Sequence, residues 1–480
     1  MLNLKQQLNS FLLYLLPFLM RSVLPILTLP VFTRFLTPND YGVLALVSIY
    51  VTLIVGLSNL GMIVIFERNY FEEKTIIERI QLMWSLISIV SLLLLASTIF
   101  SVRFEDTIIE FLFNRNLPSR LLLFTFLHLG VKSLLQYFYM FYRNSETPKK
   151  FTTLAIIESI LSTSISLILV VFYEQGIVGF IKGQSIGVCS VFAYLLIGAF
   201  FKREFSINFF KIKSTIKLSA PLTPRIFFGV INSQFDRYML GGLNTVNGVG
   251  IYDIGQKIAN LGFVFMTTLQ QIFAPRLYAI YFEDKENFRI ESGNLLAPFY
   301  FLSTFFCFLL GLFSEEAIYL LTTPEYYDST PIILILTMLY ASYFFGKQPQ
   351  LLLVKKTGLI SFLSIFTVGL NVLLNIPLIY FYGIYGAAWG TFISGIISSG
   401  IAFFFAQKHL PIHYAKETIT FHLILLGGIL ILIILWFIKT PYSIRLISKI
   451  LILISFLSTG HYYGYLTHQN FKSIINSIKR

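Results

Sequence analysis

Charged residues are scarce in this sequence. Only 12% of the 480 residues are Asp, Glu, Lys or Arg, whereas 56% are hydrophobic and 17% are aromatic. This composition excludes a soluble protein and predicts one that crosses a membrane many times. Cysteine is scarce too. Cys189 and Cys307 lie inside apolar runs, which is typical of inert core thiols and indicates nothing about the redox compartment.

Several catalytic motifs are absent as well. The sequence has no glycine-rich phosphate loop followed by Lys-Ser or Lys-Thr, which argues against ATP as the energy source. No Ser or Cys nucleophile motif stands out. His409 and His413 are separated by Pro411, which argues against a metal pair on one helix face. The loops are also short for a membrane polymerase, so the sequence favours a transporter over an enzyme.

Long apolar runs are what the sequence does contain. Because backbone groups in hydrocarbon must bond within their own segment, each run is predicted to be a helix. The fourteen runs cover residues 11–33, 41–66, 80–102, 119–141, 151–172, 176–201, 217–243, 249–273, 293–313, 330–353, 358–381, 384–406, 418–438 and 445–465. The predicted fold is an all-α integral membrane protein with about fourteen transmembrane helices.

Lys and Arg are distributed unevenly along the chain. The two termini and the even-numbered loops hold 22 of them, the odd-numbered loops hold six and the spans hold eight. Because positive loops stay in the cytoplasm, both termini are predicted to be cytoplasmic. The ninth loop contains Glu315, Glu316, Glu325 and Asp328 without a cation, and is predicted to face outward. The net charge of +13 is spread singly between apolar runs, which argues against nucleic acid as a partner.

Two short residue patterns, one near each end of the first half of the chain, recur 207 or 208 residues later in the second half. The matched glycines, 207 residues apart, are Gly176, Gly179 and Gly183 with Gly383, Gly386 and Gly390. The second set, 208 residues apart, is Thr37, Asn39 and Gly42 with Thr245, Asn247 and Gly250. The repeat predicts two six-helix lobes at residues 1–204 and 205–409, with two helices appended at 410–480. Such halves are typical of secondary transporters, whose site lies at the interface of the halves.

One predicted span is unusually polar. In the run Lys217–Leu243, Arg225, Asn232 and Asp236 fall within one stripe about 60° wide, and Arg237 adds a further charge. A charge at the bilayer centre costs about 2.5–3.5 kcal/mol, so the stripe must face other helices or water. We interpret it as the lining of a substrate path.

Other spans also carry ionisable and amide side chains. They are Arg21 in the first span, His128 and Lys132 in the fourth, Glu158 in the fifth, Asp253, Lys257, Asn260 and Gln271 in the eighth, and Lys347 in the tenth. The predicted spans contain eight cations but only three anions, which are Glu158, Asp236 and Asp253. About five cations are therefore left over, and this surplus predicts an anionic substrate. Arginine suits phosphate because its planar fork makes two parallel hydrogen bonds.

Some of these charged residues also have a purely structural interpretation. Lys182, Lys449 and Arg237 can be snorkelling side chains or members of helix–helix pairs. Asp253 and Lys257 are four residues apart and can simply pair with each other.

Three stretches carry a family resemblance. Residues 29–47 (LPVFTRFLTPNDYGVLALV), 233–259 and 383–396 (GIYGAAWGTFISGI) resemble the Wzx-type polysaccharide-biosynthesis flippases. These belong to the multidrug/oligosaccharidyl-lipid/polysaccharide exporter superfamily, and the resemblance covers essentially the whole chain. It implies a MATE-like, V-shaped pair of lobes around a central cavity. One departure is that related murein-precursor flippases carry an arginine in the second helix, whereas residues 41–66 here contain no charge.

The resemblance also implies a function. It implies that an undecaprenyl-diphosphate-linked oligosaccharide is flipped across a bacterial cytoplasmic membrane for surface polysaccharide synthesis. No cofactor is implied, although a proton or sodium gradient is often proposed to drive such proteins. The expected partners are the lipid-linked substrate and the polysaccharide polymerase machinery, with the flippase working as a monomer. An exporter of cationic drugs and an integral-membrane polymerase are the alternatives.

Overall fold

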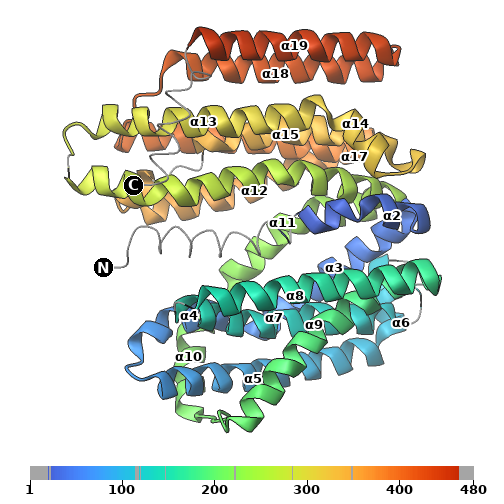
Figure 1. The fold of residues 1–480 in the computed structure, drawn as a ribbon, viewed down its shortest axis with the longest axis vertical. Coiled ribbons are helices and arrows are strands. Elements are labelled where there is room, and N and C mark those ends of the chain that lie inside the picture. The colour runs from blue at the N-terminus through green and yellow to red at the C-terminus, as the bar shows by residue number, and fades with distance from the viewer. Residues whose placement is uncertain are drawn as a thin grey trace. The chain divides into compact units, whose positions relative to one another are not determined.

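Figure 1 presents a computed structural model of the chain, which describes residue 20 and residues 23–463 except 114–117, 119, 146, 221–222, 284 and 347–349. Within these residues, helices are the only regular secondary structure. The predicted all-α class is therefore confirmed.

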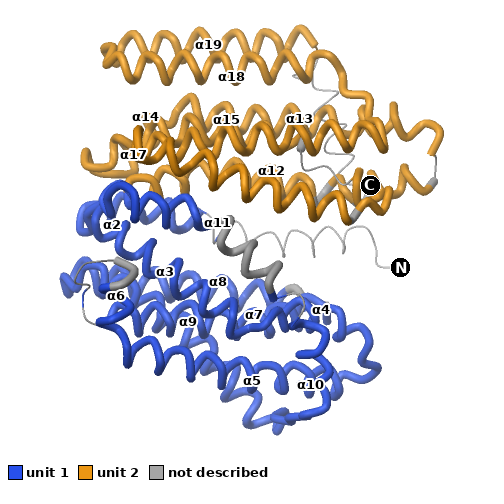
Figure 2. Tube along the Cα trace, turned by 180° about the vertical axis from the view of Figure 1, so that it is seen from behind, with its two compact units in different colours: residues 1–250 blue, residues 251–480 orange. Residues whose placement is uncertain are grey.

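The chain forms two compact units, unit 1 at residues 1–250 and unit 2 at residues 251–480 (Figure 2). Unit 1 contains α2 (Leu29–Phe35), α3 (Pro38–Asn59), α4 (Met62–Glu72), α5 (Ile76–Arg103), α6 (Glu105–Phe113), α7 (Leu121–Asn144), α8 (Pro148–Leu167) with the π-helical turn η1 (Ile168–Phe172), α9 (Gly176–Phe201), α10 (Phe209–Ser219) and α11 (Thr223–Leu243). The next helix, α12 (Val246–Glu283), begins in unit 1 and continues into unit 2. The lobe boundaries after residues 204 and 409 stay a prediction.

Unit 2 is built around one central helix. Its further elements are α13 (Phe288–Leu312), α14 (Ser314–Leu321), the 3-10 helix η3 (Pro324–Ser329), α15 (Thr330–Gly346), α16 (Gln350–Leu353), α17 (Thr357–His409), α18 (Lys416–Phe437) and α19 (Tyr442–Tyr462). Every side chain of α15 from residue 330 to 342 is buried, and α13, α17 and α18 pack against this helix. The two last helices, α18 and α19, form a neighbouring pair on one side of the unit (Figure 1).

Ten helices in the described part of the chain are long and apolar enough to cross a membrane. They confirm a multi-pass membrane protein. The helices α11 and α12 are also long, but their composition is more polar, and most of the first predicted span lies outside the described residues. The total of fourteen spans thus stays a prediction.

The two predicted repeats share local backbone geometry. Gly176 and Gly383 both have positive φ, 53° and 56°, which glycine adopts at no steric cost. Gly176 is the first residue of α9, which follows η1, and Gly383 interrupts the long α17 with non-helical backbone angles. The predicted break between residues 381 and 384 is therefore confirmed, and each glycine marks a helical corner.

The second repeat concerns helix starts. Thr37 caps α3 in a capping box with Asp40, and the hydroxyl of Thr245 accepts the backbone N–H of Gly248 at 3.0 Å at the start of α12. Within unit 1, a Cβ on Gly42 would overlap the carbonyl of Val246, and a Cβ on Gly250 would overlap that of Pro38. The first turns of α3 and α12 therefore contact each other reciprocally, which requires glycine in both.

Candidate functional site

The structure describes only part of the predicted site. Arg21 and Lys347 lie outside the described residues. Arg225 and Asn232 lie in α11 and Gln271 lies in α12, but their side chains are not described. The predicted roles of these five residues stay predictions.

One ion pair lies in unit 1, where α7 and α8 pack together. Glu158 on α8 is buried and accepts a hydrogen bond from the Tyr139 hydroxyl at 2.9 Å. The Nζ of Lys132 on α7 lies 3.9 Å from the same carboxylate, and the lysine side chain is 36% exposed. His128, one turn earlier, is buried. Lys132 and Tyr139 of the predicted polar face of the fourth span therefore meet at Glu158, because residues seven apart share one side of a helix.

A second pair lies on α12, in unit 2. The Nζ of Lys257 is 2.6 Å from the carboxylate of Asp253, one turn away. Asp253 is buried, the lysine side chain is 41% exposed, and Asn260 is exposed on the following turn. The pairing interpretation of these two residues is therefore correct. In both units, a buried carboxylate accompanies a lysine that remains accessible.

Neighbouring charges on α11 point in different directions. Asp236 is buried within unit 1, whereas Arg237 is partly exposed and donates from Nη1 to the Gln234 side chain at 3.1 Å. Successive helix residues are about 100° apart, so the two charges need not share an environment. This partner lies on the same helix, so it tests neither the snorkelling nor the helix–helix interpretation of Arg237, and both stay predictions.

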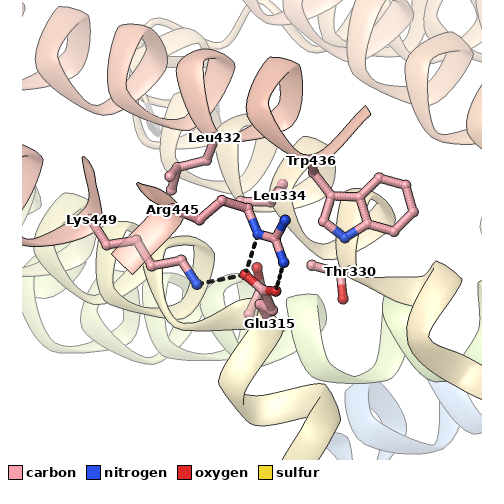
Figure 3. Close-up of a pocket in the computed structure, with 8 residues that line it drawn as sticks. Glu315, Thr330, Leu334, Leu432, Trp436, Arg445 and Lys449 are labelled. Carbon is pink, nitrogen blue, oxygen red and sulfur yellow. Dashed lines mark hydrogen bonds and ion pairs between the residues drawn. The ribbon is translucent and has the colours of Figure 1, made fainter. Parts of the chain in front are cut away.

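Among the described residues, a group of enclosed charges lies in unit 2, where α14 meets α19 (Figure 3). The Nη2 of Arg445 is 2.6 Å from Glu315, and its Nε is 3.2 Å from the other carboxylate oxygen. The Nζ of Lys449 is 2.9 Å from Glu315 and 2.7 Å from Glu316. We call these four residues the α14–α19 cluster. Leu334, Leu432 and Trp436 line the same pocket.

Electrostatics explain why this cluster is stable. Burial alone would raise the pKa of Glu315, but the hydrogen bonds and charges of Arg445 and Lys449 lower it below the ordinary 4.5. The Tyr319 hydroxyl also donates to Glu315 at 3.1 Å. Glu315 therefore stays ionised, and the cluster holds α19 against α14.

The α14–α19 cluster corrects the charge count made from the sequence. That count left Lys449 without an anion because it considered only carboxylates inside spans. The lysine instead pairs with two glutamates from the ninth loop, which were predicted to be part of an outward-facing acidic loop. Lys132 and Lys257 pair with Glu158 and Asp253, which the count had already subtracted. Only the pairing of Lys449 lowers the surplus, from about five cations to about four.

Sequence reasoning missed two buried amides on α17. Asn371 and Asn375 are one turn apart in an otherwise apolar stretch, and both are buried. Asn371 donates from Nδ2 to the Ser394 hydroxyl at 3.3 Å, across the corner at Gly383. Two asparagines spaced by four in an apolar run were a usable signal.

Comparison with known proteins places the chain in a family. The family model described as polysaccharide biosynthesis protein matches residues 8–281, more than half of the chain. The chain belongs to this family. The membership predicted from the three sequence stretches is confirmed.

Among curated proteins, this family member is similar to the capsular polysaccharide biosynthesis protein CapF of Staphylococcus aureus. The two are 28% identical over 138 residues, which make up 28% of this chain and 34% of CapF. The chain therefore spans about a third of the length of the curated relative that it matches.

Solved structures with the same fold include two transporters. The lipid II flippase MurJ, in an inward closed conformation, has a TM-score of 0.69 and 18% identity, and covers 94% of this chain and 99% of MurJ. An inward-facing MATE family transporter of the MOP superfamily has a TM-score of 0.60 and 14% identity, covering 83% and 98%. At such identities the likeness shows the fold alone, and it confirms the predicted MATE-like membrane fold.

Two chemical settings stand out among the described charges of this polysaccharide biosynthesis family member. The side chains of Lys132 and Lys257 are 36% and 41% exposed, each beside a buried carboxylate. The cations of the α14–α19 cluster are nearly enclosed and directed at glutamates. The first setting leaves the cation accessible, whereas the second holds α14 and α19 together.

Proposed function

We propose that this protein is a flippase that moves an undecaprenyl-diphosphate-linked oligosaccharide from the inner to the outer leaflet of a bacterial cytoplasmic membrane. It would supply repeat units for O-antigen, capsule or exopolysaccharide synthesis, with both termini in the cytoplasm. The family match over residues 8–281 is the observation that carries the proposal. CapF and MurJ, by their names a capsular polysaccharide protein and a lipid II flippase, support it.

The substrate's anionic groups would bind the accessible cations. Lys132 and Lys257 are the described candidates, because each is more than one-third exposed beside a buried carboxylate. Arg237 is a third, and Arg21, Arg225 and Lys347 are proposed from the sequence. Asn232, Asn260 and Gln271 would add hydrogen bonds to sugars. A diphosphate suits such a set because charge-assisted hydrogen bonds are the strong ones.

The carboxylates would balance these charges during alternating access. Glu158, Asp236 and Asp253 are all buried, which limits their exchange with water. Each could take up a coupling cation, so a proton or sodium gradient is the proposed energy source rather than a bound cofactor. The flippase would work as a monomer and hand its product to the polymerase machinery.

Two other functions make different predictions. A MATE-like exporter of cationic drugs would place carboxylates, not lysines, at its accessible positions, and overexpression would raise drug resistance. A polymerase would make longer glycans when purified. Lys132 and Lys257 favour an anionic cargo, and therefore the flippase.

Gene deletion tests the proposal directly. We expect an undecaprenyl-diphosphate oligosaccharide of one repeat unit to accumulate, measured by mass spectrometry of lipid-linked glycans, and the surface polymer to disappear. Complementation with Arg21→Ala or Arg225→Ala is expected to fail, whereas the exposed-loop control Lys355→Gln restores the polymer. Unchanged lipid-linked glycans and surface polymer in the deletion strain would sink the proposal.

A further inference from the structure

A short helix in unit 1 lies across the ends of the spans rather than beside them. Figure 1 shows α10 running across the ends of α4 and α5, and these two helices are its main contacts. Three candidate spans reach their ends here: Pro38–Glu72, Ile76–Arg103 and Gly176–Phe201. A helix at the ends of membrane spans lies where lipid tails give way to headgroups and water.

The segment before α10 is fixed in place by side chains of α5. The backbone N–H of Asn208 donates to Ser85 at 2.8 Å, and Gln81 donates to Ser206 at 2.9 Å. The rings of Phe205 and Trp84 pack with centroids 4.3 Å apart. The connection between α9 and α10 therefore has a defined orientation.

One face of α10 is anchored to the protein. Ile212, Thr215 and Ser219 are buried on that face. Lys211 forms an ion pair with Glu73 at 2.7 Å and donates to the backbone carbonyl of Glu78 at 3.1 Å. Because Lys211 is bound to residues of the α4–α5 region, the helix cannot rotate about its axis without breaking the ion pair.

The opposite face presents aromatic rings and lysines together. Phe209 and Phe210 are 81% and 80% exposed, and Lys213 and Lys217 lie between them around the helix. At the end of α9, Phe201 is 79% exposed and is followed by the exposed Lys202. We call these six residues the α10 patch. Residues 201–220 hold five cations and one carboxylate, Glu204, so their net charge is +4.

Exposed phenylalanines beside lysines fit one kind of partner. Large apolar rings standing in water are unfavourable, but at a bilayer surface they enter the acyl boundary while lysines reach the phosphates. Clusters of cations just outside a span attract anionic headgroups. We propose that the α10 patch is a docking surface for anionic phospholipid headgroups of the leaflet at that end of the spans. This proposal is independent of which substrate the protein transports.

Lipid enrichment around the reconstituted full-length protein tests the proposal. A donor dye is attached at Ser214→Cys, on the exposed side of α10, with Cys189 and Cys307 replaced by alanine. Energy transfer to acyl-labelled phosphatidylglycerol is compared with transfer to acyl-labelled phosphatidylcholine in mixed vesicles. Each cation near an anionic surface contributes about fivefold in binding, so we expect phosphatidylglycerol to be enriched at least about fivefold beside α10.

Matched variants test whether the α10 patch, rather than the overall positive charge of the protein, causes the preference for phosphatidylglycerol. Lys202→Gln, Lys213→Gln and Lys217→Gln together should abolish the preference, and the corresponding triple arginine variant should restore it. The control removes three exposed lysines of unit 2, Lys355, Lys356 and Lys408, and should leave the preference intact. High salt should weaken it in the wild type. Equal transfer from both lipids in the wild type, or an unchanged preference in the triple glutamine variant, overturns the proposal.

A competitor distinguishes membrane lipid from substrate. Farnesyl diphosphate carries the diphosphate of the proposed substrate on a short chain. If it displaces phosphatidylglycerol from α10 while inorganic pyrophosphate does not, the surface is a substrate entry site and the proposal is overturned. If neither displaces it, lipid docking is supported. This result holds even if the deletion experiment shows no flippase function.

Discussion

Two buried glutamates, one in each unit, hold their lysines differently. In unit 2, Glu315 is paired with Arg445 and Lys449, and the three side chains are 3%, 13% and 4% exposed. In unit 1, Glu158 is equally buried, but Lys132 lies 3.9 Å away and is 36% exposed. Glutamate and lysine thus belong to an enclosed cluster in unit 2, whereas in unit 1 the lysine stays accessible.

This difference indicates what each charge is for. Removing one partner from an enclosed cluster leaves an uncompensated buried charge, so the cluster is sensitive to any change. A lysine that is more than one-third exposed can reach a phosphate without the opening of an enclosed cluster. Exposure of the cation, rather than its presence in a span, therefore separates structural charges from candidates for binding.

Glu315→Gln should give the largest effect, because it leaves Arg445 and Lys449 facing a neutral amide. We expect a loss of about 3–5 kcal/mol in the free energy of unfolding, measured by denaturant titration in detergent. The flipping rate per folded molecule should stay close to that of the wild type. Glu325→Gln, an exposed residue of the same loop, is the control and should change stability little. Equal effects of the two variants would mean that the cluster is not structural.

Lys132→Gln should lower transport, and it should also cost some stability because it leaves the buried Glu158 without its ammonium. Removing one charge-assisted contact to a diphosphate should lower the flipping rate in proteoliposomes about tenfold or more. Lys257→Gln should lower the flipping rate to a similar extent, because Lys257 has a similar exposure beside a buried carboxylate. The loss of stability should be smaller than for Glu315→Gln, because both lysines are more than one-third exposed and their charges are less enclosed. Lys355→Gln is the matched control. Full transport in both variants would contradict the assignment of the accessible cations.

Arg445→Lys tests geometry within the enclosed cluster. Arg445 reaches both carboxylate oxygens of Glu315, which a lysine ammonium cannot reproduce with the same fork. We expect a loss of about 1–2 kcal/mol in unfolding free energy. Lys132→Arg keeps the charge at a site without a bidentate contact and should leave stability unchanged. If the two conservative changes cost the same, the fork of Arg445 is not what holds the cluster.

Much of the fold could be predicted from the sequence because a bilayer allows few solutions. Backbone groups in hydrocarbon must be satisfied within each helix, so apolar length alone located the main spans. The two apolar runs 358–381 and 384–406 were predicted as separate spans, and the structure has a non-helical corner at Gly383 between them, inside α17. The break of the second span at Leu60 and Gly61, and the extension of α12 to Glu283, were not predicted.

The candidate site could be predicted less well, because charge pairing depends on tertiary contacts. Asp253 and Lys257 were found by their spacing on one helix. Glu315 and Arg445 are 130 residues apart, and no local pattern links them. Counting charges span by span therefore missed the pairing of Lys449 with a loop. Glu158 and Lys132 were both noted, but only the packing of α7 on α8 brings them together.

The smallest expected effect is a pH dependence confined to the enclosed cluster. Glu315 has a pKa below its ordinary 4.5 in the folded protein, so its stabilising contribution is present above pH 4.5 and is lost as the pH falls through the folded value. The stability difference between wild type and Glu315→Gln should therefore be constant near neutral pH and shrink below pH 4.5. Lys132→Gln leaves the cluster intact, so its stability should follow the wild-type pH profile. A difference between wild type and Glu315→Gln that stays constant down to the lowest measurable pH would show that the carboxylate charge does not stabilise the cluster, and that the shape of the side chain does.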